Sequence, residues 1–286
     1  MAPLSAESIA ANTTTVASLP ELHQQLEAAI LSPASTLDDL ARIIGNEPGL
    51  AARLLKLANS ALYRHSGRIE TITRALTLIG TRQLQELALA TLVIERFRLL
   101  ETPQLSMREF WRNALATAIA ARVIAIHLRE RDSERFFLAG LFHKIGRLVL
   151  FTDHPELATQ SLIQAQQAGL LLSDAEEQLL GFHHAEIGHA LLKQWNLPAL
   201  HCEGVRHHIA PSIAPTTSVV ACIVHLANWL ADGAAFGHAG DHFAPRLDPG
   251  ALRTLGLCAA TLESLLNELE RQYQDVEPLL LGETDG

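Results

Sequence analysis

The sequence predicts an all-α protein with an N-terminal helical bundle packed on a second helical subdomain. Over most of its 286 residues, apolar side chains recur at intervals of three and four, which is the spacing of one helix face. Residues that cap helices precede several of these segments, and Gly or Pro separates them. We find no alternation of apolar and polar residues typical of strands, and no internal repeat.

We assign residues 19–104 to the N-terminal subdomain. Pro20 is placed to start its first helix, because proline is favoured in the first helical turn. Ser35 or Thr36 can cap the next helix, and Pro48 lies in the first turn of the one after it. These and the later helices are expected in the segments STLDDLARIIG, EPGLAARLLKLANSALY, ETITRALTLIG and TRQLQELALATLVIERF.

The second subdomain is expected over residues 105–270. Ser106 can cap a long helix, SMREFWRNALATAIAARVIAIHL, and FLAGLFHKIGRLVL, residues 137–150, is expected to form a buried helix. In SDAEEQLLG, the spacing of Ser173 and Glu176 predicts a capping box.

Three segments lack a clear helical pattern. Residues 1–18 are rich in Ala, Ser and Thr, without periodicity, and we expect them to be mobile. Residues 233–250 are rich in Gly, Pro and His, which favours a long loop. Residues 271–286 are expected to form a C-terminal tail that follows the last helix.

The composition limits the kinds of protein that this can be. The formal net charge is −9, which argues against a general binder of nucleic acid or of anionic membranes. The three cysteines are far apart and show no CxxC spacing, which fits a reducing compartment without a disulfide framework. The N-terminus has no signal-peptide pattern, and no stretch approaches the ~20 apolar residues of a membrane span. We therefore expect a cytoplasmic protein.

The charge is unevenly distributed. Between Arg42 and Arg98 there are nine Arg or Lys residues and four Glu, a local excess of five positive charges. A cationic interaction surface is one interpretation, and a solvated helical face is the other. The candidate residues are Arg42, Arg53, Lys56, Arg74 and Arg82. The stretch LDDLARIIGNEPGLAARLLKLA superficially resembles a helix-turn-helix, but its second helix lacks base-reading side chains, so we expect two packed helices.

Histidines cluster in the second subdomain. Imidazole is the commonest metal ligand, and several helices could direct such groups inward, although single buried histidines are mostly structural. His143 is flanked one turn away by Ala139, Gly140 and Gly146, and such small residues let a partner helix approach closely. We therefore expect His143 at a tight helix crossing. No nucleophile motif and no Gly-rich phosphate loop occurs.

Together, these segments resemble the HDOD family, which is related to the HD-type metal phosphohydrolases and occurs in bacterial signalling proteins. The resemblance runs from about Leu19 to about Leu269. It depends on the order of segments such as LPELHQQL, IETITRALTLIG, FWRNALATA, FLAGLFHKIGRLVL, HHAEIGHALLKQWNLP, VRHH and CIVHLANWLAD. It implies an all-helical fold, in which a helical bundle packs on an HD-like domain, and a regulatory role in signal transduction.

The resemblance also assigns positions in the HD site. The first histidine of the catalytic enzymes corresponds to Asn113, and the namesake His-Asp pair corresponds to His143 and Lys144. The closing aspartate corresponds to Asn228. The later histidines correspond to His184, His207 and His208. The first histidine and both carboxylates are therefore replaced, and a hard divalent cation would lose its anionic ligands.

Lys144 adds a positive charge about where a metal ion would lie. Like charges a few ångströms apart in a partly buried site cost several kcal/mol, so we expect no metal, no other cofactor and no phosphodiesterase activity. Zinc on His143, His184 and His208 is the alternative. Lys144 either turns out of the pocket or replaces the metal ion structurally, in which case we expect it to reach backbone carbonyls or Glu186.

The resulting functional prediction is a non-catalytic regulatory or adaptor module in bacterial signalling, which acts through contacts with unknown signalling proteins. The alternative is a phosphohydrolase-like protein that binds a metal, a nucleotide or another phosphate ligand in the remnant pocket. A third hypothesis, nucleic-acid binding, would use the cationic segment that begins at Arg42.

Overall fold

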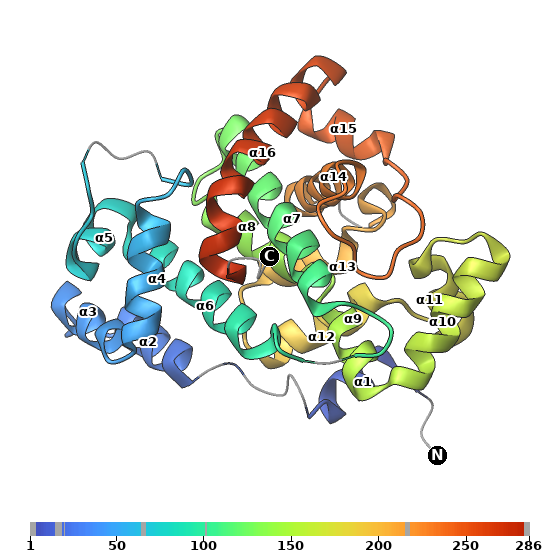
Figure 1. Cartoon of the computed structure of the whole chain (residues 1–286), viewed down its shortest axis with the longest axis horizontal. Coiled ribbons are helices and arrows are strands. Elements are labelled where there is room, and N and C mark those ends of the chain that lie inside the picture. The colour runs from blue at the N-terminus through green and yellow to red at the C-terminus, as the bar shows by residue number, and fades with distance from the viewer. Residues whose placement is uncertain are drawn as a thin grey trace. The chain divides into compact units, whose positions relative to one another are not determined.

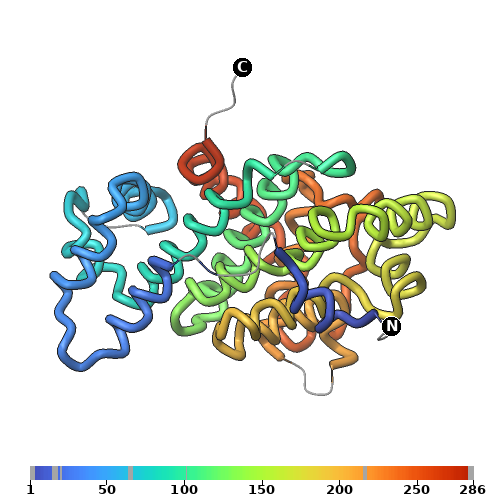
Figure 2. The backbone as a smooth tube through the Cα atoms, turned by 90° about the horizontal axis from the view of Figure 1, so that it is seen from below, coloured from blue at the N-terminus to red at the C-terminus, as the bar shows by residue number. Residues whose placement is uncertain are grey.

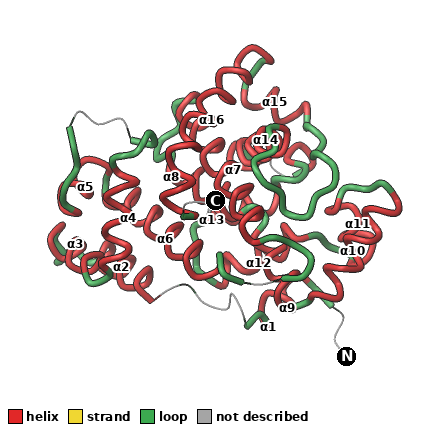
Figure 3. The backbone as a smooth tube through the Cα atoms, in the orientation of Figure 1, coloured by secondary structure: helices red, strands yellow, loops and turns green. Residues whose placement is uncertain are grey.

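The computed structural model confirms the all-α class (Figure 1), and Figure 3 shows helices joined by loops. No strand occurs in the part of the chain that the structure describes. The described residues are 4–14, 19, 21–63, 67–100, 102–214 and 218–282.

The chain divides into two compact units. The larger unit comprises residues Met1–Ser18 and Leu100–Leu269, and the smaller comprises Leu19–Leu99 and Glu270–Gly286. The structure divides the chain after Leu99. The sequence places the subdomain boundary five residues later, after residue 104, in the same loop between Phe97 and Met107.

The smaller unit contains the five helices expected in the first third. They are α2 (Glu21–Leu31), α3 (Leu37–Gly45), α4 (Pro48–Ala58), α5 (Ile72–Ile79) and α6 (Thr81–Phe97). Thr36 caps α3 by accepting from the backbone N–H of Asp39, and Pro48 begins α4. Gly80, at φ 106°, separates α5 from α6 in a conformation that favours glycine. Pro20, the expected start of α2, lies outside the described residues.

The larger unit is built around α7 (Met107–His127), which packs along α8 (Glu134–Phe142) and α14 (Val219–Gly233). Ser106 caps α7 as expected. Figures 1 and 2 show the hairpin of α10 and α11 beside this core. The other elements are α1 (Ala6–Asn12), α9 (Ile145–Asp153), α10 (Pro155–Ala168), α11 (Leu172–Leu180), α12 (His184–Gln194), α13 (Ala199–His207), η1 (Pro211–Ile213) and α15 (Pro249–Leu255). The helix α16 (Ala259–Leu281) begins in this unit, and its residues from Glu270 onward belong to the smaller unit. No described helix is both long enough and apolar enough to cross a bilayer.

Both chain ends contain helix where the sequence analysis expected a mobile segment and a tail. Within residues 1–18, the described part forms α1, which Ser5 caps and whose buried residues Ile9 and Ala10 pack against α12. Three apolar residues bury enough surface here to order a segment that has little periodic pattern. Within residues 271–286, α16 continues to Leu281, because Tyr273 and Val276 are buried and extend its apolar face.

Two local predictions in the second subdomain are wrong. Residues 137–150 are not one helix: α8 ends at Phe142 and α9 begins at Ile145, with Lys144 at φ −107°, ψ 15° between them. The capping box of Ser173 and Glu176 does not form. α11 begins before Ser173, and the Glu176 carboxylate is bonded to other elements of the core.

Glycines set how closely the helices around His143 approach, as expected. A Cβ on Gly140 would lie 2.8 Å from the carbonyl oxygen of Thr117 in α7. A Cβ on Gly146 would lie 2.0 Å from the carbonyl oxygen of His184, at the start of α12. The break after α8 therefore lets α9 pass α12 at a distance that only glycine permits.

Candidate functional site

Three of the predicted histidines gather in the core of the larger unit. The rings of His143 and His208 are 5.1 Å apart and nearly perpendicular, and those of His184 and His208 are 5.6 Å apart. They come from the α8–α9 break, the start of α12 and the end of α13. The structure therefore brings together the three imidazoles that the sequence analysis named as the alternative zinc ligands.

His143 is buried and fully bonded. Its Nδ1–H donates to the carbonyl oxygen of Gly140 at 2.7 Å, and its Nε2 lies 2.9 Å from the side-chain amide of Asn228. Burial, together with the charge of Lys144, lowers the pKa of His143 to about 3. The ring is therefore neutral and Nε2 is an acceptor, so the Asn228 amide must turn its NH₂ group towards it.

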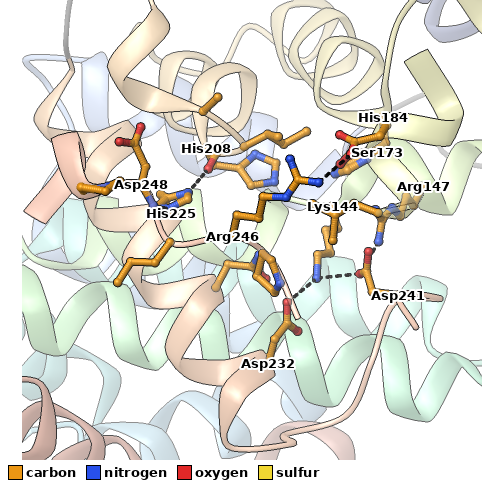
Figure 4. A pocket seen from close by; sticks show the side chains of 18 residues that line it. Lys144, Arg147, Ser173, His184, His208, His225, Asp232, Asp241, Arg246 and Asp248 are labelled. Carbon is orange, nitrogen blue, oxygen red and sulfur yellow. Dashed lines mark hydrogen bonds and ion pairs between the residues drawn. The ribbon is translucent and has the colours of Figure 1, made fainter. Parts of the chain in front are cut away.

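Lys144 points into the core and is only 3% exposed. Its Nζ lies 3.1 Å from Oδ1 of Asn113, 3.3 Å from Oδ2 of Asp232 and 3.1 Å from Oδ2 of Asp241. Figure 4 shows the ammonium group between the two carboxylates. The inward orientation agrees with the expected metal-like position, but the expected partners, backbone carbonyls or Glu186, are wrong.

Glu186 is used elsewhere, because its carboxylate accepts from the backbone N–H of His183 at 2.8 Å and caps α12. The partners of Lys144 come instead from two neighbouring elements. Asp232 is one helical turn beyond Asn228 on α14, and Asp241 lies in the 233–250 loop. The predicted long loop is confirmed, and it contributes a charged residue to the site.

Arg147 extends the network of charges. It is 1% exposed, and its guanidinium bonds to Glu176 at 3.1 Å, to the carbonyl oxygen of Ala239 at 3.0 Å and to Asp241. Burial alone would raise the pKa of Asp241, but Arg147 and Lys144 outweigh this and hold it well below its usual range. Buried charges persist when they are paired in this way.

Glu176 connects the network to the histidines. One of its carboxylate oxygens accepts from the backbone N–H of His184 at 2.9 Å and from Nδ1–H of the same ring at 2.6 Å. Burial and the charge of Arg147 hold the pKa of His184 well below its usual value, so the ring is neutral and its Nδ1–H is a donor.

A cavity of about 280 Å³ opens beside these groups. Its polar lining includes Lys144, Arg147, Ser173, His184, His208, Asn228, Arg246 and the carboxylates of Asp174, Asp232, Asp241 and Asp248. Apolar side chains complete the wall. They are Leu171, Ile209, Ala210, Pro245, Leu247 and Pro249.

Two further histidines of this region have different roles. His207 does not line the cavity, and its Nε2 lies 3.4 Å from Glu203 on the same helix. The HD-site position assigned to it is therefore not part of the cavity. His225 uses both nitrogens structurally: Nδ1–H donates to the carbonyl oxygen of His208, and Nε2 accepts from the backbone N–H of Asp248.

The donor set does not fit a divalent metal ion of the HD type. The Nε2 atom of His143 faces an amide, and the position beside it carries an ammonium group. The nearest carboxylates are already bonded to Lys144 and Arg147. Among the described residues, no group of three or more His, Cys, Asp or Glu is arranged to hold a metal ion.

The sequence comparison missed Asp232, Asp241, Arg147 and Glu176. One signal for Asp232 is present in CIVHLANWLAD, where Leu-Ala is followed first by Asn228 and, four residues later, by Asp232. Residues four apart share a helix face. Arg147 is four residues after His143 in an otherwise apolar segment, which indicates a buried charge that needs a partner. Nothing in the sequence locates Asp241.

The candidate cationic surface lies in the smaller unit. Arg42 pairs with Asp39, and Arg53 pairs with Glu95 at 2.6 Å, so two of the five charges are locally neutralised. The other three residues, Lys56, Arg74 and Arg82, are exposed.

The fold and this arrangement define an HD-like helical domain. A family model described as the HDOD domain matches residues 16–211, and the chain belongs to this family, which is related to the HD phosphohydrolases. A Treponema pallidum protein of uncharacterised function is 29% identical over 214 residues, or 71% of this chain. The match covers only 39% of that relative.

Solved structures agree on the fold. An HDOD domain protein of unknown function from Geobacter sulfurreducens superposes with a TM-score of 0.77 at 23% identity, covering 96% of this chain and 98% of the other. A presumed phosphohydrolase from Shewanella amazonensis gives a TM-score of 0.70 at 23% identity, with 94% and 99% covered. At these identities the likeness shows the fold alone.

Proposed function

We propose that this chain is a non-catalytic regulatory module that acts through protein contacts, in which Lys144 does structurally what a metal ion does in the HD enzymes. One observation carries the proposal: the Lys144 ammonium group is buried against Asn113, Asp232 and Asp241. An ammonium group can neutralise carboxylates, but it cannot act as a Lewis acid or lower the pKa of a bound water.

The charges around Lys144 support this reading. Asp232 and Asp241 supply two negative charges, and the ammonium group and Arg147 offset them. A divalent cation placed beside Lys144 would meet like charge in a buried site, where each ångström of approach costs much more than in water. Metal would therefore have to displace Lys144, and its ion pairs would be lost.

The test combines metal analysis with a hydrolysis assay. The protein is purified without chelators, its Mn, Fe and Zn contents are measured, and hydrolysis of bis-p-nitrophenyl phosphate is followed with added Mn²⁺. We expect substoichiometric metal and no turnover above that of a His143→Ala variant. Stoichiometric metal, with turnover that the His143→Ala variant loses, would refute the proposal.

A gain-of-site variant provides the matched control. Lys144→Asp combined with Asn228→Asp returns carboxylates to the two positions that the HD comparison assigns to aspartate. We expect this double variant to bind Mn²⁺ more tightly than the native chain in a calorimetric titration. Equal binding by both would show that Lys144 does not exclude the metal.

The partner of an adaptor must be identified directly. We propose the exposed cations of the smaller unit, Lys56, Arg74 and Arg82, as its contact surface. Affinity capture from the native cell, with the triple Glu variant as bait in parallel, should enrich a signalling protein with the native bait only. Equal enrichment by both baits would exclude this surface.

The phosphate-binding alternative has less support. It requires the positive charge of Lys144 and the histidines to face a ligand, but Lys144 is paired with two carboxylates and the rings are neutral. A thermal-shift titration with inorganic phosphate and with nucleotides tests it, and a saturable stabilisation would favour it over the adaptor alone.

A further inference from the structure

One buried nitrogen in the cavity has no bonding partner. His184 is 1% exposed and lines the cavity, and its Nδ1–H is used by Glu176. Its Nε2 atom has no hydrogen-bond partner. In a neutral ring whose Nδ1 is protonated, Nε2 carries a lone pair and can only accept. A buried acceptor without a donor is costly, so the site favours a ligand or a water that supplies one.

His208 presents a second acceptor. Its Nδ1–H donates to the carbonyl oxygen of Val205 at 2.7 Å, and no described residue bonds to its Nε2. Burial and the neighbouring rings hold its pKa well below the usual value, so this ring is also neutral. The cavity therefore contains two imidazole lone pairs whose orientation is set by bonds on the opposite nitrogens.

These lone pairs select the chemistry of an occupant. An anion would meet two acceptors, and Lys144 is already neutralised by Asp232 and Asp241. A cation would lie near Lys144 and Arg147. An uncharged group with two N–H donors avoids both penalties and satisfies both acceptors. The His184 and His208 ring centres are 5.6 Å apart, so the two rings are close enough for one small group to contact both.

We propose that this cavity binds an uncharged small molecule through a planar amino group, on a carboxamide or an aromatic ring, that donates to Nε2 of His184 and Nε2 of His208. The apolar wall of Leu171, Ile209 and Leu247 covers the rest of such a molecule. The exposed Arg246 side chain, which lies 3.9 Å from Asp174, also lines the cavity and can donate to an acceptor on the molecule. The inference rests on the proposed function, because a metal ion in this cavity would use the Nε2 lone pairs of His184 and His208 and leave no acceptor for the amino group.

The experiment uses matched probes that differ in the amino group alone. Nicotinamide is compared with 3-acetylpyridine, and adenine with purine, by titration of the full-length protein labelled with ¹⁵N-histidine. Long-range ¹H–¹⁵N spectra report the Nε2 shift of each ring. We expect at least one amino probe to move the Nε2 signals of His184 and His208 upfield, as hydrogen bonding to a lone pair does. The matched probe without the amino group should bind at least about tenfold more weakly.

A pair of variants locates the effect. His208→Phe keeps an aromatic ring at this position but removes the Nε2 acceptor, together with the Nδ1–H donor to Val205, and it should weaken binding of the amino probe by about tenfold. His207→Phe makes the same change at the adjacent position outside the cavity and should leave binding unchanged. Equal affinity for both members of each probe pair, or no shift with any probe, would overturn the proposal and leave water as the donor.

A zinc titration separates this failure from failure of the proposed function. If one equivalent of Zn²⁺ shifts the Nε2 signals of His143, His184 and His208, the cavity is a metal site, and both proposals fall. If neither zinc nor any amino probe shifts them, the adaptor proposal stands and only the ligand proposal is lost.

Discussion

Removal of the Lys144 charge is the sharpest test of its structural role. Lys144→Met keeps most of the side-chain volume and removes the ammonium group from Asn113, Asp232 and Asp241. Breaking a buried ion pair by removing one partner typically costs ~3–5 kcal/mol. Asp241 keeps Arg147 as a partner, so the uncompensated charge falls mainly on Asp232. We therefore expect a loss near the lower end, about 3 kcal/mol, in the free energy of unfolding at pH 8.

The loss should depend on pH. Burial already raises the pKa of Asp232, with Lys144 opposing the rise, and the variant removes that opposition. A carboxyl group whose folded pKa is raised destabilises the fold above that pKa, and the penalty disappears as the group takes up a proton on acidification. The difference between the native chain and Lys144→Met should therefore shrink between pH 8 and pH 5.

Urea denaturation of both chains at pH 5 and pH 8 measures this difference, because subtraction removes the titration of the groups far from Lys144 that both chains share. Adding Asp232→Asn to Lys144→Met should recover part of the loss at pH 8. A loss below about 1 kcal/mol at pH 8, with no recovery in the double variant, would contradict the idea that Lys144 holds this site together.

Three further predictions concern the same core. Gly146→Ala places a Cβ 2.0 Å from the carbonyl oxygen of His184, so chemical denaturation should show a loss of about 3 kcal/mol or more in the free energy of unfolding. In the control variant Gly45→Ala, the Cβ meets nothing within 4 Å, so the change should be neutral or slightly stabilising. Burial lowers the pKa of His143 to about 3 and that of His23 to about 4. The free energy of unfolding should therefore fall as the pH drops below 6.5, because the unfolded rings take up protons that the folded rings cannot. A free energy of unfolding that stays constant between pH 7 and pH 5 would contradict the neutral rings. Glu176→Gln removes one of the two carboxylates that pair with the buried Arg147, the other being Asp241, and should cost about 3 kcal/mol. Glu95→Gln, opposite the partly exposed Arg53, should cost under about 1 kcal/mol in the same assay.

Several elements followed from local chemistry. Thr36 caps α3, Pro48 begins α4 and Gly80 divides α5 from α6, because each residue type stabilises a particular backbone conformation whatever surrounds it. The small residues around His143 predicted a close helix crossing, since the absence of a side chain at Gly140 is itself what permits the approach. These signals are contained in a few consecutive residues.

Other features depended on contacts between distant segments. Ser173 and Glu176 have the spacing of a capping box, but Glu176 gains more from Arg147 and His184 than from a helix N-terminus. The break at Lys144 and the ordering of α1 have the same origin, because each follows from packing against α12.

The sequence by itself determined the all-helical class and the family, and it predicted that Lys144 and Asn228 occupy the positions of the HD carboxylates. Only the tertiary structure decided where the Lys144 charge goes. Its partners Asp232 and Asp241 lie 88 and 97 positions further along the chain, and a buried charge takes whichever opposite charge the fold brings within reach. Periodicity and capping are encoded in neighbouring residues, whereas electrostatic pairing in a core is encoded in the packing of the whole unit.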